Sequence, residues 1–240
     1  MKFNLPFGYF IRVTRKFKSK KVIIPVGYDC HPAYVLQKTT LRKQSFPFDW
    51  MLTDPIKAID FAYSNIQEEF QYFMSDLAVD QAGNVFAKKY PEAVFYHYKD
   101  LIKNATLREK INKRCSIAMR KIKTKSVSYL FVVPSLHVDS EKAVQTYFQS
   151  LQLFATILKP SDDLLVYVRF ENSEEENQEF CFQLLEKIKV LSQVHITTFV
   201  LESAVYGLWG NEQKYRTLLT NLKVDYYHVA PKIKLEKNKE

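Results

Sequence analysis

Glycine is scarce in this sequence, and its scarcity excludes the common nucleotide-binding loops. Only five glycines occur among the 240 residues, at positions 8, 27, 83, 207 and 210. None belongs to a G-x-G-x-x-G or a G-x-x-x-x-G-K-[ST] pattern, in which glycines let the backbone approach phosphate groups. ATP and NAD are therefore excluded as expected ligands, and we predict no cofactor.

Cysteine is also rare, and its spacing excludes a disulfide framework. Cys30, Cys115 and Cys181 are odd in number, far apart in the sequence and without a C-x-x-C pair. His97 and Asp100 have an i, i+3 spacing, but a third ligand is not evident, so we predict no metal site. This cysteine usage fits a reducing compartment, and we expect a cytoplasmic protein.

Long apolar runs are absent, and so is charge balance at the two ends of the chain. No run approaches the ~20 apolar residues that span a bilayer. The formal net charge of +9 is concentrated in two segments, because residues 1–21 contain seven basic and no acidic residues and residues 231–240 are also basic. We therefore divide the chain into a basic aromatic N-terminal arm (1–21), an α/β domain (22–230) and a basic C-terminal tail (231–240).

The N-terminal arm mixes aromatic and aliphatic residues with its positive charge. Pro6 and Gly8 interrupt its short apolar stretch and the charges follow that stretch, which is unlike a signal peptide. Two interpretations stay open. The arm either contacts an anionic membrane, placing the protein at the inner face of that membrane, or packs on the domain as a first strand with solvated lysines. We expect no nucleic-acid partner.

Strand and helix patterns alternate along most of the domain. Apolar β-branched runs predict strands, and amphipathic stretches predict helices between them. The predicted strands are 22–26, 127–134, 164–170, 195–201 and a short one at 226–229, and the predicted helices include 33–41, 107–125, 140–158, 174–191 and 211–222. Buried strands that alternate with helices imply a mostly parallel sheet covered on both faces. We predict one three-layer α/β domain with a mostly parallel central sheet and helices on both faces.

A cysteine lies where the first of these strands meets the first helix. Gly27 ends the strand and allows a turn, and Pro32 occupies the position of the first helical residue, just before 33–41, where proline is best tolerated. The free amides and dipole of the helix would stabilise a thiolate at Cys30 and could form an oxyanion hole. The more ordinary interpretation of a single cysteine in this position is a buried, inert side chain.

A carboxylate set among bulky apolar residues follows closely. In Ser45-Phe46-Pro47-Phe48-Asp49-Trp50, Asp49 is surrounded in sequence by aromatic residues and proline. Because burial of an unpaired charge is costly, Asp49 requires a partner. It either orients a catalytic histidine or caps the helix that begins near Thr53.

These segments together resemble a bacterial family of papain-like cysteine peptidases. The resemblance rests on Gly27-Tyr28-Asp29-Cys30, on Leu41-Arg42 and on the Pro47-Phe48-Asp49-Trp50 block, and it extends to Phe95-Tyr96-His97 and the basic helix after it. It covers roughly residues 22 to 122. At the nucleophile the chain has Tyr28-Asp29-Cys30-His31, where papain relatives often have Gly-x-Cys-Trp. The strand–helix alternation also differs from the papain layout, so we keep the α/β prediction.

A thiol nucleophile needs a base within hydrogen-bond reach and a group that orients the base. We predict Cys30 as the nucleophile, His97 as the base and Asp49 as the group that orients it. His137 is the alternative base, because it follows a strand on the same rim of the sheet. The residues expected to bind substrate are Arg42, Trp50, Arg114 and His137.

The sequence thus predicts a cysteine-dependent hydrolase or acyl transferase that acts on an amide, ester or thioester through Cys30. The alternative is a protein or transferase of bacterial surface-polysaccharide assembly that binds a sugar or an anionic carrier without thiol chemistry. Under that alternative, Trp50 and Trp209 could stack on a sugar ring. A lowered pKa of the Cys30 thiol would favour the first interpretation.

Overall fold

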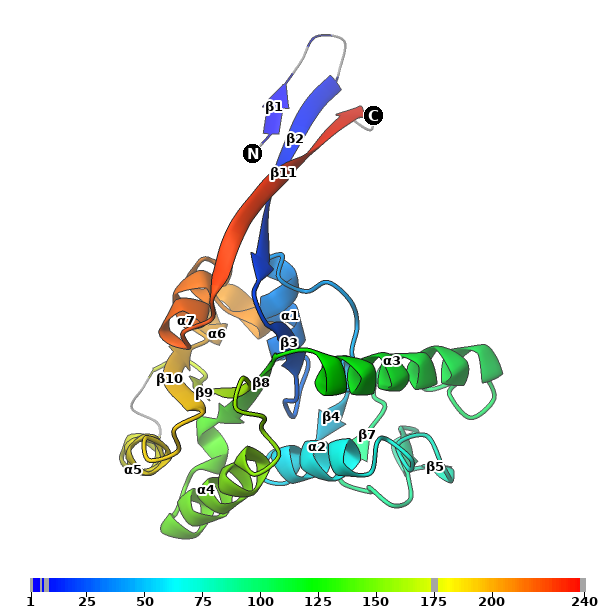
Figure 1. Ribbon diagram of the computed structural model, residues 1–240, viewed down its shortest axis with the longest axis vertical. Coiled ribbons are helices and arrows are strands. Elements are labelled where there is room, and N and C mark those ends of the chain that lie inside the picture. The colour runs from blue at the N-terminus through cyan, green and yellow to red at the C-terminus, as the bar shows by residue number, and fades with distance from the viewer. Residues whose placement is uncertain (1, 5, 7–8, 174–176, 238–240) are drawn as a thin grey trace.

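Three sheets and seven α-helices make up the described part of the chain, residues 2–4, 6, 9–173 and 177–237 of the computed structural model (Figure 1). The central sheet contains β3 (Val22–Pro25), β8 (Val127–Pro134), β9 (Asp163–Phe170) and β10 (Val194–Val200). Its strand order is β10-β9-β8-β3, and each neighbouring pair is parallel. These strands are the apolar runs expected from the sequence.

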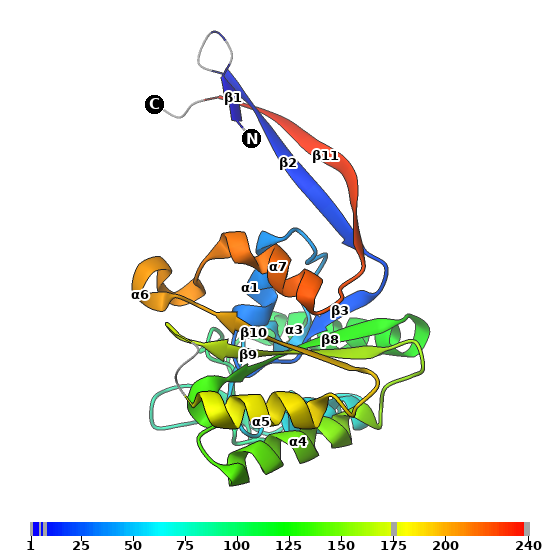
Figure 2. The same ribbon diagram turned by 90° about the vertical axis from the view of Figure 1, so that its left-hand side faces the viewer.

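Helices cover both faces of this central sheet, because alternate residues of each strand are apolar on opposite sides (Figure 2). On one face, Leu130 and Val132 of β8 pack with α1 (His31–Lys38) and α7 (Tyr215–Asn221). On the other, Phe131 and Val133 belong to a larger core with α4 (Glu141–Ala155) and α5 (Gln178–Ile188). The helix α4 begins where the sequence indicates, since the Ser140 hydroxyl accepts a hydrogen bond from the Ala143 amide.

A second, antiparallel sheet lies in the segment between α1 and β8. It contains β4 (Leu52–Thr53), β5 (Leu77–Val79), β6 (Val85–Ala87) and β7 (Ala93–Val94), in the order β4-β7-β6-β5. The helices α2 (Ala58–Gln67) and α3 (Ala105–Thr124) belong to the same segment. These strands of two or three residues are too short to show an alternating pattern in the sequence.

The third sheet projects from the body of the molecule (Figures 1 and 2). It consists of β1 (Lys2–Asn4), β2 (Tyr9–Ser19) and β11 (Tyr226–Lys237), in the order β1-β2-β11, and we call it the ribbon. Its strands are antiparallel, and β11 pairs with β2 along almost its whole length. Residues assigned from the sequence to an arm and a tail therefore pair with each other, and the short strand expected at 226–229 continues to Lys237.

The prediction of a single mixed α/β domain is confirmed at that level. The prediction of one three-layer arrangement is wrong, because residues outside the strand–helix alternation build two further sheets. Short helical turns complete the described chain: η2 (Pro47–Trp50), η3 (Ser135–His137), α6 (Ser203–Tyr206), η4 (Gly207–Trp209) and η5 (Glu212–Lys214). None of the described helices combines the length and the apolar character needed to cross a membrane.

Candidate active site

Cys30 lies in a tight turn between β3 and α1. It is the residue before the first residue of α1, and its carbonyl accepts a hydrogen bond from the Tyr34 amide. Gly27 is required in this turn, since a Cβ atom there would lie 2.9 Å from Cγ of Pro32. The Cys30 side chain is buried, with 7% of its surface exposed. The turn therefore holds the thiol firmly at the edge of the central sheet.

His97 comes to this thiol from the small antiparallel sheet. It follows β7 by three residues, and Phe95, two residues before it, is buried in the larger core. The Nε2 atom of His97 lies 3.5 Å from Sγ of Cys30. The indole of Trp50 packs against the imidazole edge to face, with ring centroids 5.9 Å apart. The expected nucleophile and the expected base therefore meet.

The pair opens into a cavity of about 470 Å³ at the carboxyl ends of the central strands. Ligands of parallel α/β sheets bind at this end of the strands. The lining is mainly aliphatic and aromatic, with three charged residues; it comprises Tyr28, Asp29, Cys30, His31, Leu52, Tyr96, His97, Arg169, Glu171, Leu201, Ser203, Leu208 and Trp209. An acyl group bound here would lie beside the thiol.

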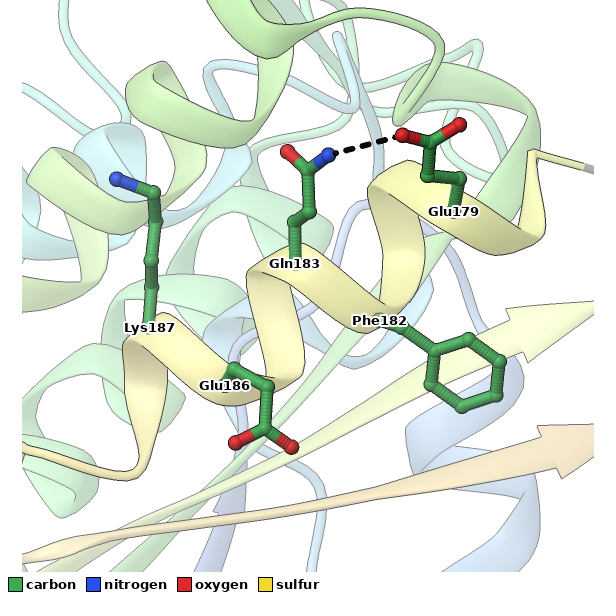
Figure 3. A pocket seen from close by; sticks show the side chains of 5 residues that line it. All are labelled: Glu179, Phe182, Gln183, Glu186 and Lys187. Carbon is green, nitrogen blue, oxygen red and sulfur yellow. Dashed lines mark hydrogen bonds between the residues drawn. The ribbon is translucent and has the colours of Figure 1, made fainter.

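Another hollow, of about 610 Å³, lies on the surface of α5 (Figure 3). Five side chains of that single helix line it, and Gln183 and Glu179 are hydrogen-bonded to each other. It contains no thiol and no imidazole. Among the described residues, no group of three or more side chains is placed to hold a metal ion. The cavity beside Cys30 is thus the better candidate for a reaction site.

The surroundings of Cys30 raise the pKa of its thiol, whereas the sequence predicts a lowered one. Burial raises the pKa of the thiol to about 12, and the nearby carboxylates of Asp29 and Asp49 add to this increase. The helix terminus offers little compensation, because the His31 amide donates to Asp29 Oδ1 at 2.9 Å and Pro32 has no amide hydrogen. The shift of the thiol pKa is therefore opposite to the one expected, and the oxyanion hole expected from the helix amides remains a prediction. The Cys30 thiol is therefore harder to ionise than an exposed cysteine.

Asp49 is fully buried and bound to an arginine. Its Oδ2 accepts hydrogen bonds from Nε and Nη2 of Arg42, at 3.1 and 2.6 Å, and from the Phe46 amide at 3.0 Å. Burial raises the pKa of the Asp49 carboxyl, and the Arg42 charge opposes that rise. Within the described chain these are the hydrogen-bond partners of the Asp49 side chain, and His97 is not one of them. Asp49 therefore has the partner that its burial requires, but the contact to the base is indirect.

Arg42 links this carboxylate to the base. Its guanidinium lies 5.1 Å from the centroid of the Trp50 ring, close enough for a cation–π contact. Trp50 in turn contacts the imidazole of His97. A continuous set of contacts thus runs from Asp49 through Arg42 and Trp50 to His97.

The four residues expected to bind substrate lie outside the described lining of the cavity. Trp50 packs against the imidazole of His97, and Arg42 packs against Trp50. Arg114 donates a hydrogen bond to the hydroxyl of Tyr98 at 2.7 Å. His137 is exposed in η3 and does not line the cavity. Its roles as alternative base and as substrate contact remain predictions.

Arg169 is a site residue that the sequence interpretation missed. It is buried at the end of β9 and donates to Asp29 Oδ2 at 2.6 Å and to the Tyr28 hydroxyl at 2.5 Å. A weaker contact of 3.4 Å joins it to Glu171. The signal was a single arginine inside an otherwise apolar strand, where an unpaired charge would be costly. Arg169 fixes the residues that precede Cys30.

His31, the neighbour of the nucleophile, is part of the core. Its Nδ1 atom lies 2.7 Å from the Tyr167 hydroxyl, and its ring is buried. Burial lowers the pKa of its imidazole to about 4, with the Arg169 charge as a second cause. The lowered pKa favours a neutral imidazole, and its Nδ1 is bound to Tyr167, so His31 is a poor candidate for the base of Cys30.

Comparison with known proteins identifies a family for most of the chain. The model of a family described as "Putative papain-like cysteine peptidase (DUF1796)" matches residues 21–202, which include Cys30 and His97. No curated protein and no solved structure matches the chain.

Proposed function

Because the chain belongs to this papain-like cysteine peptidase family, we propose that it is a cysteine-dependent hydrolase or acyl transferase acting on an amide, ester or thioester. Cys30 is the nucleophile and His97 the general base in this proposal. The observation that carries it is the 3.5 Å separation of Sγ and Nε2 beside a cavity large enough for a small acyl group.

The raised pKa of the thiol determines when its proton moves. A free thiolate is unfavourable in this buried site near two carboxylates, so the proton passes to His97 Nε2 as Sγ attacks the carbonyl carbon. The leaving group then takes that proton from the imidazolium, and a thioester to Cys30 remains. Water or another acceptor, deprotonated by His97, attacks the thioester and releases the thiol.

We assign Asp49 and Arg42 to positioning the base. The carboxylate holds the guanidinium, the guanidinium lies against Trp50, and Trp50 limits the rotation of the His97 ring. Arg169 has the corresponding role on the nucleophile side, since it holds Asp29 next to Cys30. The apolar lining, which includes Leu52, Leu208 and Trp209, favours an apolar group next to the scissile bond.

The test compares two cysteines that are equally buried. Cys30 and Cys115 both have 7% of their surface exposed, and burial raises the pKa of each thiol to about 12. In Cys30→Ala, we expect loss of the burst of p-nitrophenol released from p-nitrophenyl acetate and loss of the acetylated protein in mass spectra. The control Cys115→Ala should keep both. Equal bursts in the two variants would overturn the proposal.

A further inference from the structure

One face of the ribbon is mainly apolar, with Lys237 beside Tyr9 at its far end. Residues paired across antiparallel strands share a face, and alternate residues along a strand point to opposite faces. The pairs Ile11–Leu235 and Val13–Ile233 lie on one face, and Phe3 of β1 is paired with Ile11 beside them. Ile233 and Leu235 are 65% and 64% exposed, and Phe3 is 50% exposed. Large apolar side chains therefore lie in solvent on one face of the ribbon.

Lysines occupy the opposite face. Lys232 and Lys234 alternate with the two exposed aliphatic residues of β11 and are paired with Thr14 and Arg12 of β2. Lys16 and Lys18 continue the same alternation along β2 and so lie on this face as well. All four lysine side chains are exposed. The three strands contain a single acidic residue, Glu236, so the sheet has a strong positive charge.

We propose that the ribbon binds the surface of an anionic lipid bilayer. An amphipathic element with apolar residues on one face and lysines on the other lies in the interface plane, with its apolar face in the acyl boundary. The lysines then lie among the phosphates, which attract each of them within about a Debye length. The ribbon can reach a flat surface because it stands clear of the helices (Figures 1 and 2).

The charge and the side-chain types disfavour the other partners. A second copy of the chain would bring two strongly basic sheets together, and like charges repel. A nucleic acid would match the charge and could stack on Phe3, but it would leave the exposed aliphatic side chains of Ile233 and Leu235 without an apolar partner. Of these three partners, an anionic bilayer best matches both the exposed apolar side chains and the lysines.

The experiment measures sedimentation of the full chain with phosphatidylcholine vesicles that contain or lack phosphatidylglycerol. We expect binding to the anionic vesicles alone, with a steep fall as salt is added. The double variant Lys232→Gln/Lys234→Gln should lose about fivefold in affinity for each lysine removed. Ile233→Ser/Leu235→Ser should bind at least tenfold more weakly than the native chain.

Matched controls use equally exposed residues on the body. Val190→Ser replaces a valine that is 74% exposed, and Lys110→Gln/Lys113→Gln removes two exposed lysines of α3. Both controls should bind as the native chain does, and circular dichroism should show that every variant is folded.

Absence of binding by the native chain, or equal weakening in the controls, would overturn the proposal. Two other results would also overturn it. One is a dimer, detected by light scattering, that Ile233→Ser/Leu235→Ser converts to a monomer. The other is that the native chain binds a single-stranded oligonucleotide more tightly than it binds the anionic vesicles, and that Ile233→Ser/Leu235→Ser still binds the oligonucleotide.

Discussion

Removal of the imidazole at position 97 gives the sharpest test of the catalytic pair. In His97→Gln the side chain keeps hydrogen-bonding groups but can no longer take the thiol proton. An imidazolium 3.5 Å from a thiolate stabilises it by about 5 kcal/mol at an effective dielectric constant of about 20, which corresponds to more than three orders of magnitude in the thiolate population. That value is an upper limit, because the imidazolium forms only as the proton moves.

We therefore expect the alkylation rate of Cys30 by iodoacetamide at neutral pH to fall by about 100- to 1,000-fold in His97→Gln. Without its base, the thiol must ionise against a pKa of about 12, so the remaining rate should keep rising with pH well above neutrality. Peptide mass spectrometry can follow Cys30 and Cys115 in the same sample, and the rate at Cys115 should not change. A loss of less than about tenfold at Cys30 would refute the assignment of His97 as its base.

Three further substitutions test the surroundings of the pair. Asp49→Asn breaks a buried ion pair with Arg42 and should lower the free energy of unfolding by roughly 3–5 kcal/mol in thermal denaturation. Because the Asp49 carboxylate raises the pKa of the thiol, the same change should shift the alkylation profile to lower pH, and a shift to higher pH would contradict the electrostatics. Trp50→Phe should reduce the alkylation rate by about two- to tenfold, since it weakens an aromatic contact of about 0.5–1.5 kcal/mol to the imidazole; an unchanged rate would remove Trp50 from the positioning contacts. Gly27→Ala places a Cβ atom against Pro32 and should destabilise the fold by roughly 1–3 kcal/mol, measured by denaturant unfolding, whereas wild-type stability would show that the turn relaxes freely.

The central strands could be predicted because each is rich in apolar and β-branched residues, and β8 has the predicted ends. The strands of the small sheet could not, because β4 and β7 contain two residues each and their pairing is set by tertiary contacts. The extent of the ribbon was also missed, since β2 and β11 pair with each other from opposite ends of the chain. The pattern of residues within one strand does not indicate which distant strand it pairs with.

At the site, the resemblance to the family identified Cys30 and His97, which the structure brings together. The partner of Asp49 could not be predicted from the sequence. Arg42, seven residues earlier, binds the carboxylate from a direction that no sequence spacing indicates. The direction of the thiol pKa shift was also missed. Desolvation raises this pKa more than the end of a short helix can lower it, because the His31 amide is already bound to Asp29 and Pro32 has no amide hydrogen.

The pairing of β2 with β11 has a consequence for how the molecule assembles. Closing a loop of roughly two hundred residues costs an unfolded chain about 5 kcal/mol in entropy. We therefore expect β2 and β11 to pair late in folding. Once the body has formed, the amide of Lys20 donates to the carbonyl of Asp225, and their side chains form an ion pair, at the base of the ribbon. The strands can then zip from that base, through Ser19 and Tyr226, toward the tip. Amide hydrogen exchange should accordingly be slowest at the base and fastest at the tip, and it should be rapid throughout the ribbon whenever the body unfolds.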